Sequence, residues 1–503
     1  MDCSLKTMEN PSSRKIVPFS VFILFSLLIV GAFLFYAPSW GLMDDSGMLE
    51  RAKIVWSGGD FFGNLTQLIV GDFHWGMFRP VFWSWAMLAY HIFRNAPLLI
   101  YLSIVIFNLI TLLLWGLILH KTWQSVKNDF YYNIFLYPLS FFLFTPFWNN
   151  FMYISPQTKF IIFFSGLAIY LFYMGYAKEK KIYFVLSTVA ILLSVLSHPE
   201  GVFLNLAMLL LCPVLFLLAR KRTCIFNFIL NLILFILYFI FTVTVQLKGS
   251  YTSKYGSSLN FHALALNLTA APSLIKMLTL LSVFYFIVLA VIILRRENKF
   301  SPVFLIFPLG LVCFIAVLAP WGFPNYHLSV LTPFVMGMLF PVYSILNSKS
   351  PKIKILINSL MLVLVLLVLF FICFLRISKM RDIKKTEQFI VGLERQSKGN
   401  VYFMAAPCME ACGALNYFTN AQTVYLNDSV LTAGKLNEPG GNLMIFRDEC
   451  PQVDLEGVKE SQEVYKNRTW RIFSLAREKG SAKRLKVDFQ ENAIEKIKSF
   501  LKK

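Results

Sequence analysis

The sequence predicts a polytopic α-helical membrane protein with about 11 transmembrane helices, followed by a small C-terminal extracytoplasmic α/β domain. Hydrophobic residues make up 57% of the 503-residue chain, charged residues make up 15%, and the mean hydropathy is +0.63. A soluble domain carries roughly 25% charged residues, so this chain lacks the polar groups to cover its own surface. The 8 cysteines are too sparse for a small disulfide-stapled fold.

The apolar segments are the first element of this prediction. A hydrocarbon core about 30 Å thick needs about 20 mostly apolar helical residues to cross it. The candidate spans are residues 16–36, 98–120, 130–147, 158–176, 182–197, 201–219, 224–247, 273–294, 301–319, 328–347 and 355–375. The first is too long for a removed signal peptide and lacks a small-residue cleavage site at the right place.

The loops between these spans predict the orientation of the chain. Basic residues gather in every second loop, and with Lys6 these loops hold 17 basic and five acidic residues. Lysine and arginine collect on the cytoplasmic side, so the N-terminus is expected inside and the C-terminus outside. This asymmetry accounts for the net charge of +20, and no nucleic-acid partner is predicted.

Two further segments of residues 1–375 are expected on the outer surface. Residues 80–93, PVFWSWAMLAYHIF, are apolar but too short to cross, which favours a re-entrant or interfacial helix. The helix-like stretch 42–56 precedes them. We therefore predict outer-face interfacial helices within about 42–93, attached to the transmembrane domain.

Residues 376–503 are predicted to form the soluble outer domain. Apolar runs at 400–405, 423–426, 442–446 and 469–474 alternate with helix-like pieces at 408–417 and 491–501, which is typical of an α/β domain. Cys408, Cys412 and Cys450 fall here, outside the reducing cytosol. A bridge from Cys450 to Cys408 or Cys412 and a set of three free, buried thiols both remain open.

Polar residues gather at the predicted outer rim. Asp44 and Asp45 follow the first span; adjacent carboxylates repel, which favours proton uptake by one of them, although Asp44 also suits a helix N-cap. Arg79 and Lys159 are candidate phosphate ligands, and His198 is placed to donate to an anion. His327 is expected where the headgroup of a membrane-embedded ligand would lie. The alternatives are interfacial anchors for Arg79 and Lys159, and a plain polar turn for residues 197–201.

Other outer residues are candidates for substrate binding. Glu200 shares the turn with His198, Tyr326 precedes His327, and Tyr251 and Lys254 lie in a loop at 248–272 that is long enough to act as a lid. No glycine-rich phosphate loop, nucleophile elbow or HExxH motif occurs. The sequence therefore does not predict a cytoplasmic nucleotide-using enzyme.

The order of these features resembles a known superfamily. An outer loop that opens with Asp-Asp, followed by FRPVFWSWAMLAYHIFRNAPLLIYLSIVIFNLI, is similar to the front of GT-C glycosyltransferases. These include protein O-mannosyltransferases, aminoarabinose transferases and serotype-converting glucosyltransferases. The late segment PNYHLSVLTPF resembles the start of a late span in the same families. The resemblance covers roughly the first 120 residues and scattered later motifs.

This resemblance implies a specific reaction. A polyprenyl-phosphate-linked sugar at the outer leaflet would be the donor, and a glycan, lipid or protein hydroxyl would be the acceptor. Asp44 or Asp45 would serve as general base, and Arg79, Lys159, His198 and His327 would stabilise the leaving phosphate, with inversion. The need for a divalent metal, Mg²⁺ or Mn²⁺, stays open, and no cofactor is firmly implied. The expected setting is the bacterial inner membrane and the modification of cell-envelope polysaccharide or lipopolysaccharide.

Two other functions are alternatives to glycosyl transfer. A polysaccharide polymerase or ligase also uses lipid-linked glycans, but typically places its largest outer loop late between spans. A lipid or glycan transporter (flippase) places charge at the bilayer midplane and often has repeated halves, and neither signal occurs here.

Overall fold

The computed structural model describes most of the predicted membrane part and the strands that follow it. The described residues are 13–37, 60–74, 78–93, 96–123, 130–144, 150–151, 157–248, 271–294, 301–319, 327–349, 351–396, 401–404, 423–426, 442–446, 461–466 and 470–475.

The apolar segments form helices. All eleven predicted segments coincide with helical residues of the structure. The elements are α1 (Ser13–Tyr36), α5 (Pro97–Thr122), η2 with α6 (Tyr132–Leu136 and Tyr137–Phe144), α7 (Thr158–Lys178), α8 (Lys181–Ser197), α9 (Val202–Ala219), α10 (Thr223–Lys248), α13 (Ser273–Leu294), η5 with α14 (Pro302–Leu305 and Ile306–Leu318), η7 with α15 (His327–Leu331 and Thr332–Lys349) and α16 (Pro351–Gln396).

Among the described residues, seven helices are long and apolar enough to cross a membrane. They are Val17–Tyr36, Leu98–Thr122, Thr158–Lys178, Pro199–Leu218, Thr223–Phe241, Ser273–Ile292 and Leu328–Leu346. Lys181–Ser197 and Pro302–Leu318 are shorter apolar helices. The chain is an integral membrane protein, and the full count of eleven spans stays a prediction.

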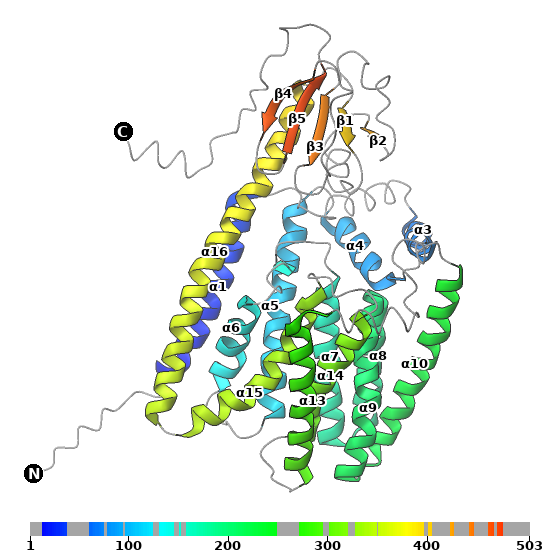
Figure 1. Ribbon diagram of the computed structural model, residues 1–503, viewed down its shortest axis with the longest axis vertical. Coiled ribbons are helices and arrows are strands. Elements are labelled where there is room, and N and C mark those ends of the chain that lie inside the picture. Colours follow the sequence, from blue (N-terminus) through cyan, green and yellow to red (C-terminus); the bar gives the residue numbers. More distant parts are fainter. Residues whose placement is uncertain are drawn as a thin grey trace, which may run out of the picture.

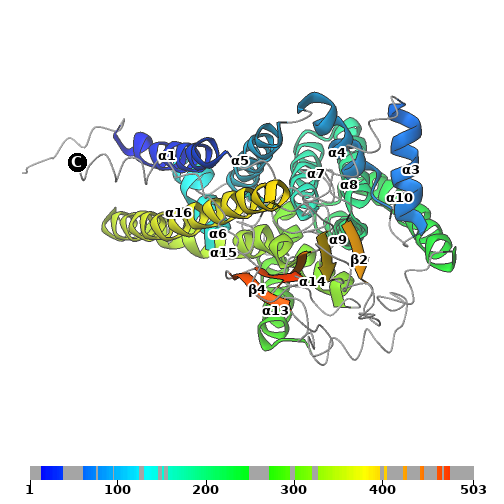
Figure 2. The ribbon, with the colours of Figure 1, turned by 90° about the horizontal axis from the view of Figure 1, so that it is seen from above.

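The two short helices α3 and α4 lie at one end of the bundle (Figure 1). α3 (Phe61–His74) and α4 (Pro80–Phe93) lie at the end that faces the β-strands, opposite the start of α1. Seen from above, α3 and α10 form one edge of the molecule and α1 with α16 form the opposite edge (Figure 2). The bounds of α4 are those of the short helix predicted at 80–93. The helix predicted at 42–56 lies outside the described residues.

Tight contacts between distant helices hold the bundle together. A Cβ on Gly310 of α14 would overlap the Phe334 ring, and one on Gly337 of α15 would overlap the Phe307 ring, so each glycine admits an aromatic side chain from the other helix. Asn205 of α9 donates to the Asn231 side chain of α10 at 3.1 Å. Small residues and interhelical amide bonds are the usual means of packing helices in lipid.

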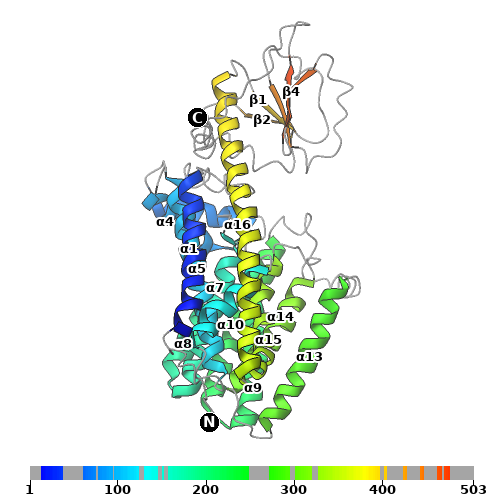
Figure 3. The same ribbon diagram turned by 90° about the vertical axis from the view of Figure 1, so that its left-hand side faces the viewer.

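The last helix connects the bundle to the strands. α16 has 46 residues, or about 69 Å of helix, and runs beside α1 for much of its length (Figure 3). The predicted domain boundary at 375/376 therefore falls inside one continuous helix. Just after the C-terminal end of α1, the Ala37 carbonyl accepts a hydrogen bond from the Lys384 ammonium at 3.2 Å.

The described strands form one mixed sheet beyond α16. Its order is β2-β1-β3-β5-β4, with β1 parallel to β2 and β3, and β5 antiparallel to β3 and β4. The strands are β1 (Val401–Met404), β2 (Thr423–Leu426), β3 (Asn442–Phe446), β4 (Ser461–Lys466) and β5 (Trp470–Leu475). Four of them match the predicted apolar runs, whereas β4, with the sequence SQEVYK, is too polar to stand out. The helix-like pieces and Cys408, Cys412 and Cys450 lie outside the described residues, so the α/β assignment stays a prediction.

Candidate functional site

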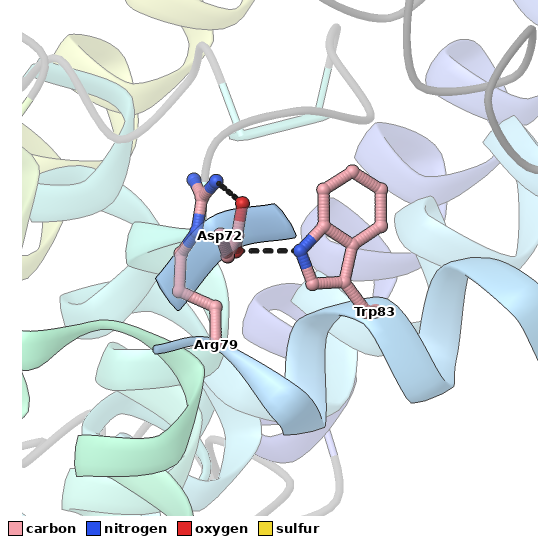
Figure 4. A network of polar contacts seen from close by, with 3 residues as sticks. All are labelled: Asp72, Arg79 and Trp83. Carbon is pink, nitrogen blue, oxygen red and sulfur yellow. Dashed lines mark hydrogen bonds and ion pairs between the residues drawn. The ribbon is translucent and has the colours of Figure 1, made fainter. Parts of the chain in front are cut away.

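An ion pair joins the two short helices α3 and α4 (Figure 4). Arg79, just before α4, donates through Nε and Nη2 to the two carboxylate oxygens of Asp72 in α3, both at 2.8 Å. Trp83 Nε1 donates to the same carboxylate at 2.6 Å. Asp72 is buried and Arg79 is only 15% exposed, so this planar, bidentate pair fixes how the helices meet.

Lys159 and His198 lie at the same level of the bundle. The antiparallel helices α7 and α8 are aligned by the Ser187 hydroxyl, which donates to the Ala168 carbonyl at 2.8 Å. Thr158, at the start of α7, is ten residues before Ala168, and Ser197, at the end of α8, is ten residues after Ser187. Because the two helices are antiparallel, these two ends, with Lys159 and His198 beside them, lie at the same level. Lys159 is fully buried, with 0% of its surface exposed. A buried ammonium near the end of an apolar bundle indicates a functional site, because its desolvation is costly.

The turn after α8 is a compact polar corner. His198 is followed by the 3₁₀ turn Pro199–Gly201, and His198 Nδ1 lies 3.7 Å from Glu200 Oε2. Glu200 is 2% exposed. A Cβ on Gly201 would lie 2.5 Å from the Ser194 carbonyl, so only glycine allows the chain to fold back this closely. The turn therefore places an imidazole and a carboxylate together at the end of α8.

A chain of contacts brings Arg79 to this corner. Phe78 packs on Phe241 of α10, with ring centroids 4.6 Å apart. One turn earlier on α10, the Tyr238 hydroxyl donates to the Pro199 carbonyl at 3.2 Å. On the other side of α4, Trp85 packs on Phe160, the residue after Lys159, with centroids 5.3 Å apart. The structure thus gathers Arg79, Lys159, His198 and Glu200 around one end of the bundle.

The remaining predicted residues are placed in part or not at all. The backbone of His327 begins η7, which contacts α7, but its side chain is not described. Asp44, Asp45, Tyr251, Lys254 and Tyr326 lie outside the described residues.

The sequence reasoning missed Asp72. The available signal was an acidic residue that follows the apolar run LIVG in a predicted interfacial region, seven positions before Arg79. In the described part of the chain, no three histidine, cysteine, aspartate or glutamate side chains gather as a metal site.

Comparison with known proteins identifies the fold. ArnT from Cupriavidus metallidurans, in a crystal structure bound to undecaprenyl phosphate, is similar over 92% of this chain and 99% of that chain, with 10% identity and a TM-score of 0.52. The apo crystal structure of ArnT aligns over 91% and 99% with 11% identity and a TM-score of 0.47. No family model matches the sequence. No curated protein matches it either. The chain therefore has a fold like that of the bound ArnT structure, in line with the fold that the sequence resemblance implies.

Proposed function

We propose that this protein is an integral membrane glycosyltransferase that moves a sugar from a polyprenyl-phosphate donor to an acceptor hydroxyl on the extracytoplasmic face. The acceptor oxygen bonds to the anomeric carbon while the bond from that carbon to the phosphate oxygen breaks. The electron pair of the broken bond leaves with the phosphate. The hydroxyl proton passes to a carboxylate, and the products are an inverted glycoside and polyprenyl phosphate.

The buried ammonium of Lys159 is the observation that carries this proposal. A polyprenyl phosphate gains negative charge as the sugar leaves, and a preorganised cation in a dry site stabilises that charge strongly. Lys159 is fully buried at the level of His198, so both groups suit the leaving phosphate. The ArnT fold supports the same reading, since ArnT was crystallised with undecaprenyl phosphate.

Arg79 has fewer donors available for a phosphate than an unpaired arginine would have. The ion pair engages Nε and Nη2 with Asp72, which leaves Nη1 outside the pair. We propose that Nη1 contacts the phosphate while Asp72 holds the guanidinium in place. His327, at the start of η7, is proposed as a further phosphate ligand.

The acceptor side is proposed from the sequence. Asp44 or Asp45 would take the hydroxyl proton, and Glu200, Tyr326, Tyr251 and Lys254 would bind the substrates. The sugar is a hexose or pentose, and the acceptor is a glycan, lipid or protein. The proposed setting is the bacterial inner membrane, with the N-terminus in the cytoplasm.

Lipid analysis and glycan profiling test this function. Cells that express the chain should contain a glycoside that is absent from cells lacking it, and their polyprenyl-phosphate sugar should be depleted. Asp44→Asn or Asp45→Asn should abolish the product without loss of membrane-inserted protein. Full activity in both variants would remove the proposed base, and identical glycan profiles with and without the chain would remove the proposed function.

A further inference from the structure

Three buried polar residues meet where α7 begins beside α5. The Asn108 amide of α5 donates to the Asn150 backbone carbonyl at 2.8 Å and to the Ile104 carbonyl at 2.9 Å. The Thr158 hydroxyl of α7 donates to Asn150 Oδ1 at 3.1 Å. Asn108, Asn150 and Thr158 are 0%, 1% and 3% exposed. These bonds connect segments 42 residues apart and hold both asparagine side chains in fixed orientations.

Each asparagine keeps one amide atom without a partner. Asn108 Oδ1 and Asn150 Nδ2 are buried and have no hydrogen-bond partner in the described part of the chain. An unmet donor or acceptor in a dry interior is costly, and water inside the hydrocarbon region is scarce. Asn108 Oδ1 is therefore an acceptor and Asn150 Nδ2 a donor that a ligand could use, while Asn108 Nδ2 and Asn150 Oδ1 are already hydrogen-bonded.

These residues adjoin the proposed phosphate ligand. Thr158 directly precedes Lys159 in the first turn of α7. On the following residue, the Phe160 ring packs on Phe107, the neighbour of Asn108, with centroids 5.4 Å apart. The first sugar of a lipid-linked donor is bonded directly to its phosphate, so a group that recognises the sugar belongs beside the group that binds the phosphate.

We propose that Asn108 and Asn150 bind one hydroxyl group of the sugar carried by the lipid donor. This inference rests on the proposed function. A hydroxyl donates one hydrogen bond and accepts others, so it carries both the donor that Asn108 Oδ1 lacks and the acceptor that Asn150 Nδ2 lacks. An ammonium cannot accept from Asn150, and a carboxylate cannot donate to Asn108. The sugar position that faces this pair therefore carries a free hydroxyl, which makes both asparagines specificity-determining residues.

The test compares donors that differ by one hydroxyl. The purified full-length chain is assayed with undecaprenyl-phosphate-linked hexoses and pentoses and with the monodeoxy analogue of each at every position. For the wild type, one analogue should lose about 100-fold or more in kcat/KM, because a site built to bond a hydroxyl rejects a donor that lacks it. Asn150→Ala should lower kcat/KM for the parent donor by about 10- to 100-fold and erase the preference for it over that analogue.

Two further variants separate recognition from folding. Thr158→Val keeps the side-chain volume but removes the hydroxyl that orients Asn150, so it should weaken the same preference. Asn205→Ala is the matched control, because Asn205 is an equally buried asparagine that bonds only within the α9–α10 contact. It should leave the preference among donors unchanged, whatever its effect on thermal stability.

The possible results separate a failure of the proposed hydroxyl site from a failure of the proposed glycosyltransferase function. A wild-type chain that transfers sugar but treats every monodeoxy donor like its parent overturns the hydroxyl site alone, and leaves Asn108 and Asn150 to hold ordered water. The hydroxyl site is also overturned if kcat/KM falls when a hydroxyl is removed from the acceptor but not when one is removed from the donor. A chain that transfers no sugar from any of these donors overturns the proposed function, and the inference falls with it.

Discussion

Asp72→Asn should destabilise the junction between α3 and α4 although it changes the side-chain shape very little. The substitution removes the negative charge opposite Arg79 and replaces one carboxylate oxygen with an amide that donates. A donor then faces one of the two guanidinium nitrogens that lie 2.8 Å from the carboxylate. The Arg79 charge, only 15% exposed, keeps too little water to replace the lost partner.

The expected cost follows from these contacts. A hydrogen bond between charged groups is worth about 1.5–3 kcal/mol, and breaking a fully buried pair costs about 3–5 kcal/mol. Because Arg79 keeps some contact with solvent, we expect about 2–4 kcal/mol for Asp72→Asn. Adding Arg79→Gln restores a neutral amide pair, so the double variant should cost less than the sum of the single variants by about 1–3 kcal/mol.

Unfolding of the purified full-length chain in detergent measures all four members of this cycle. Asp60→Asn is the control, because Asp60 precedes the same helix but is exposed and only caps the Gly63 amide at 3.0 Å. It should change the unfolding free energy far less than Asp72→Asn. A loss below about 0.5 kcal/mol for Asp72→Asn, or additive costs in the double variant, would refute the claim that this pair fixes the two helices.

Three other predictions concern the bundle and its sidedness. Lys159→Met should lower sugar transfer by about 100- to 1000-fold, because it removes the cation that we propose for the leaving phosphate. Transfer near the wild-type rate by the folded variant in membranes would exclude Lys159 from the phosphate site. Gly201→Ala should lower stability by about 1–3 kcal/mol in thermal unfolding, since its Cβ would lie 2.5 Å from the Ser194 carbonyl. An unchanged unfolding temperature would contradict this turn geometry. A reporter fused after Lys503 should read out as extracytoplasmic, and a cytoplasmic signal would invert the proposed topology.

The helices could be predicted because each one appears in the sequence as a continuous run of mostly apolar residues. Each predicted span coincides with helical residues in the part of the chain that the structure describes. α4 begins at Pro80 and ends at Phe93 as expected, because a proline suits the first helical turn. β4 was missed for the complementary reason. Its polar sequence gives no apolar run, and its strand conformation depends on pairing with β5.

The candidate site was predictable only as a list of residues. Arg79, Lys159 and His198 were selected because charge is rare in this chain and they fall at one predicted rim. Their partners were not evident. Nothing local to Arg79 indicates that Asp72 binds it bidentately, and nothing local to Thr158 indicates that Asn150 accepts its hydrogen bond.

Composition and the spacing of apolar runs alone determined that this chain is a helical membrane protein with polar groups between its spans, because lipid requires each spanning segment to satisfy its own backbone. Tertiary structure alone decided that Lys159 is fully buried, that Asp72 neutralises Arg79, and that Asn108 meets Asn150. These outcomes depend on how distant helices cross. The crossings are set by contacts such as Gly310 against Phe334, which join segments that no local pattern relates.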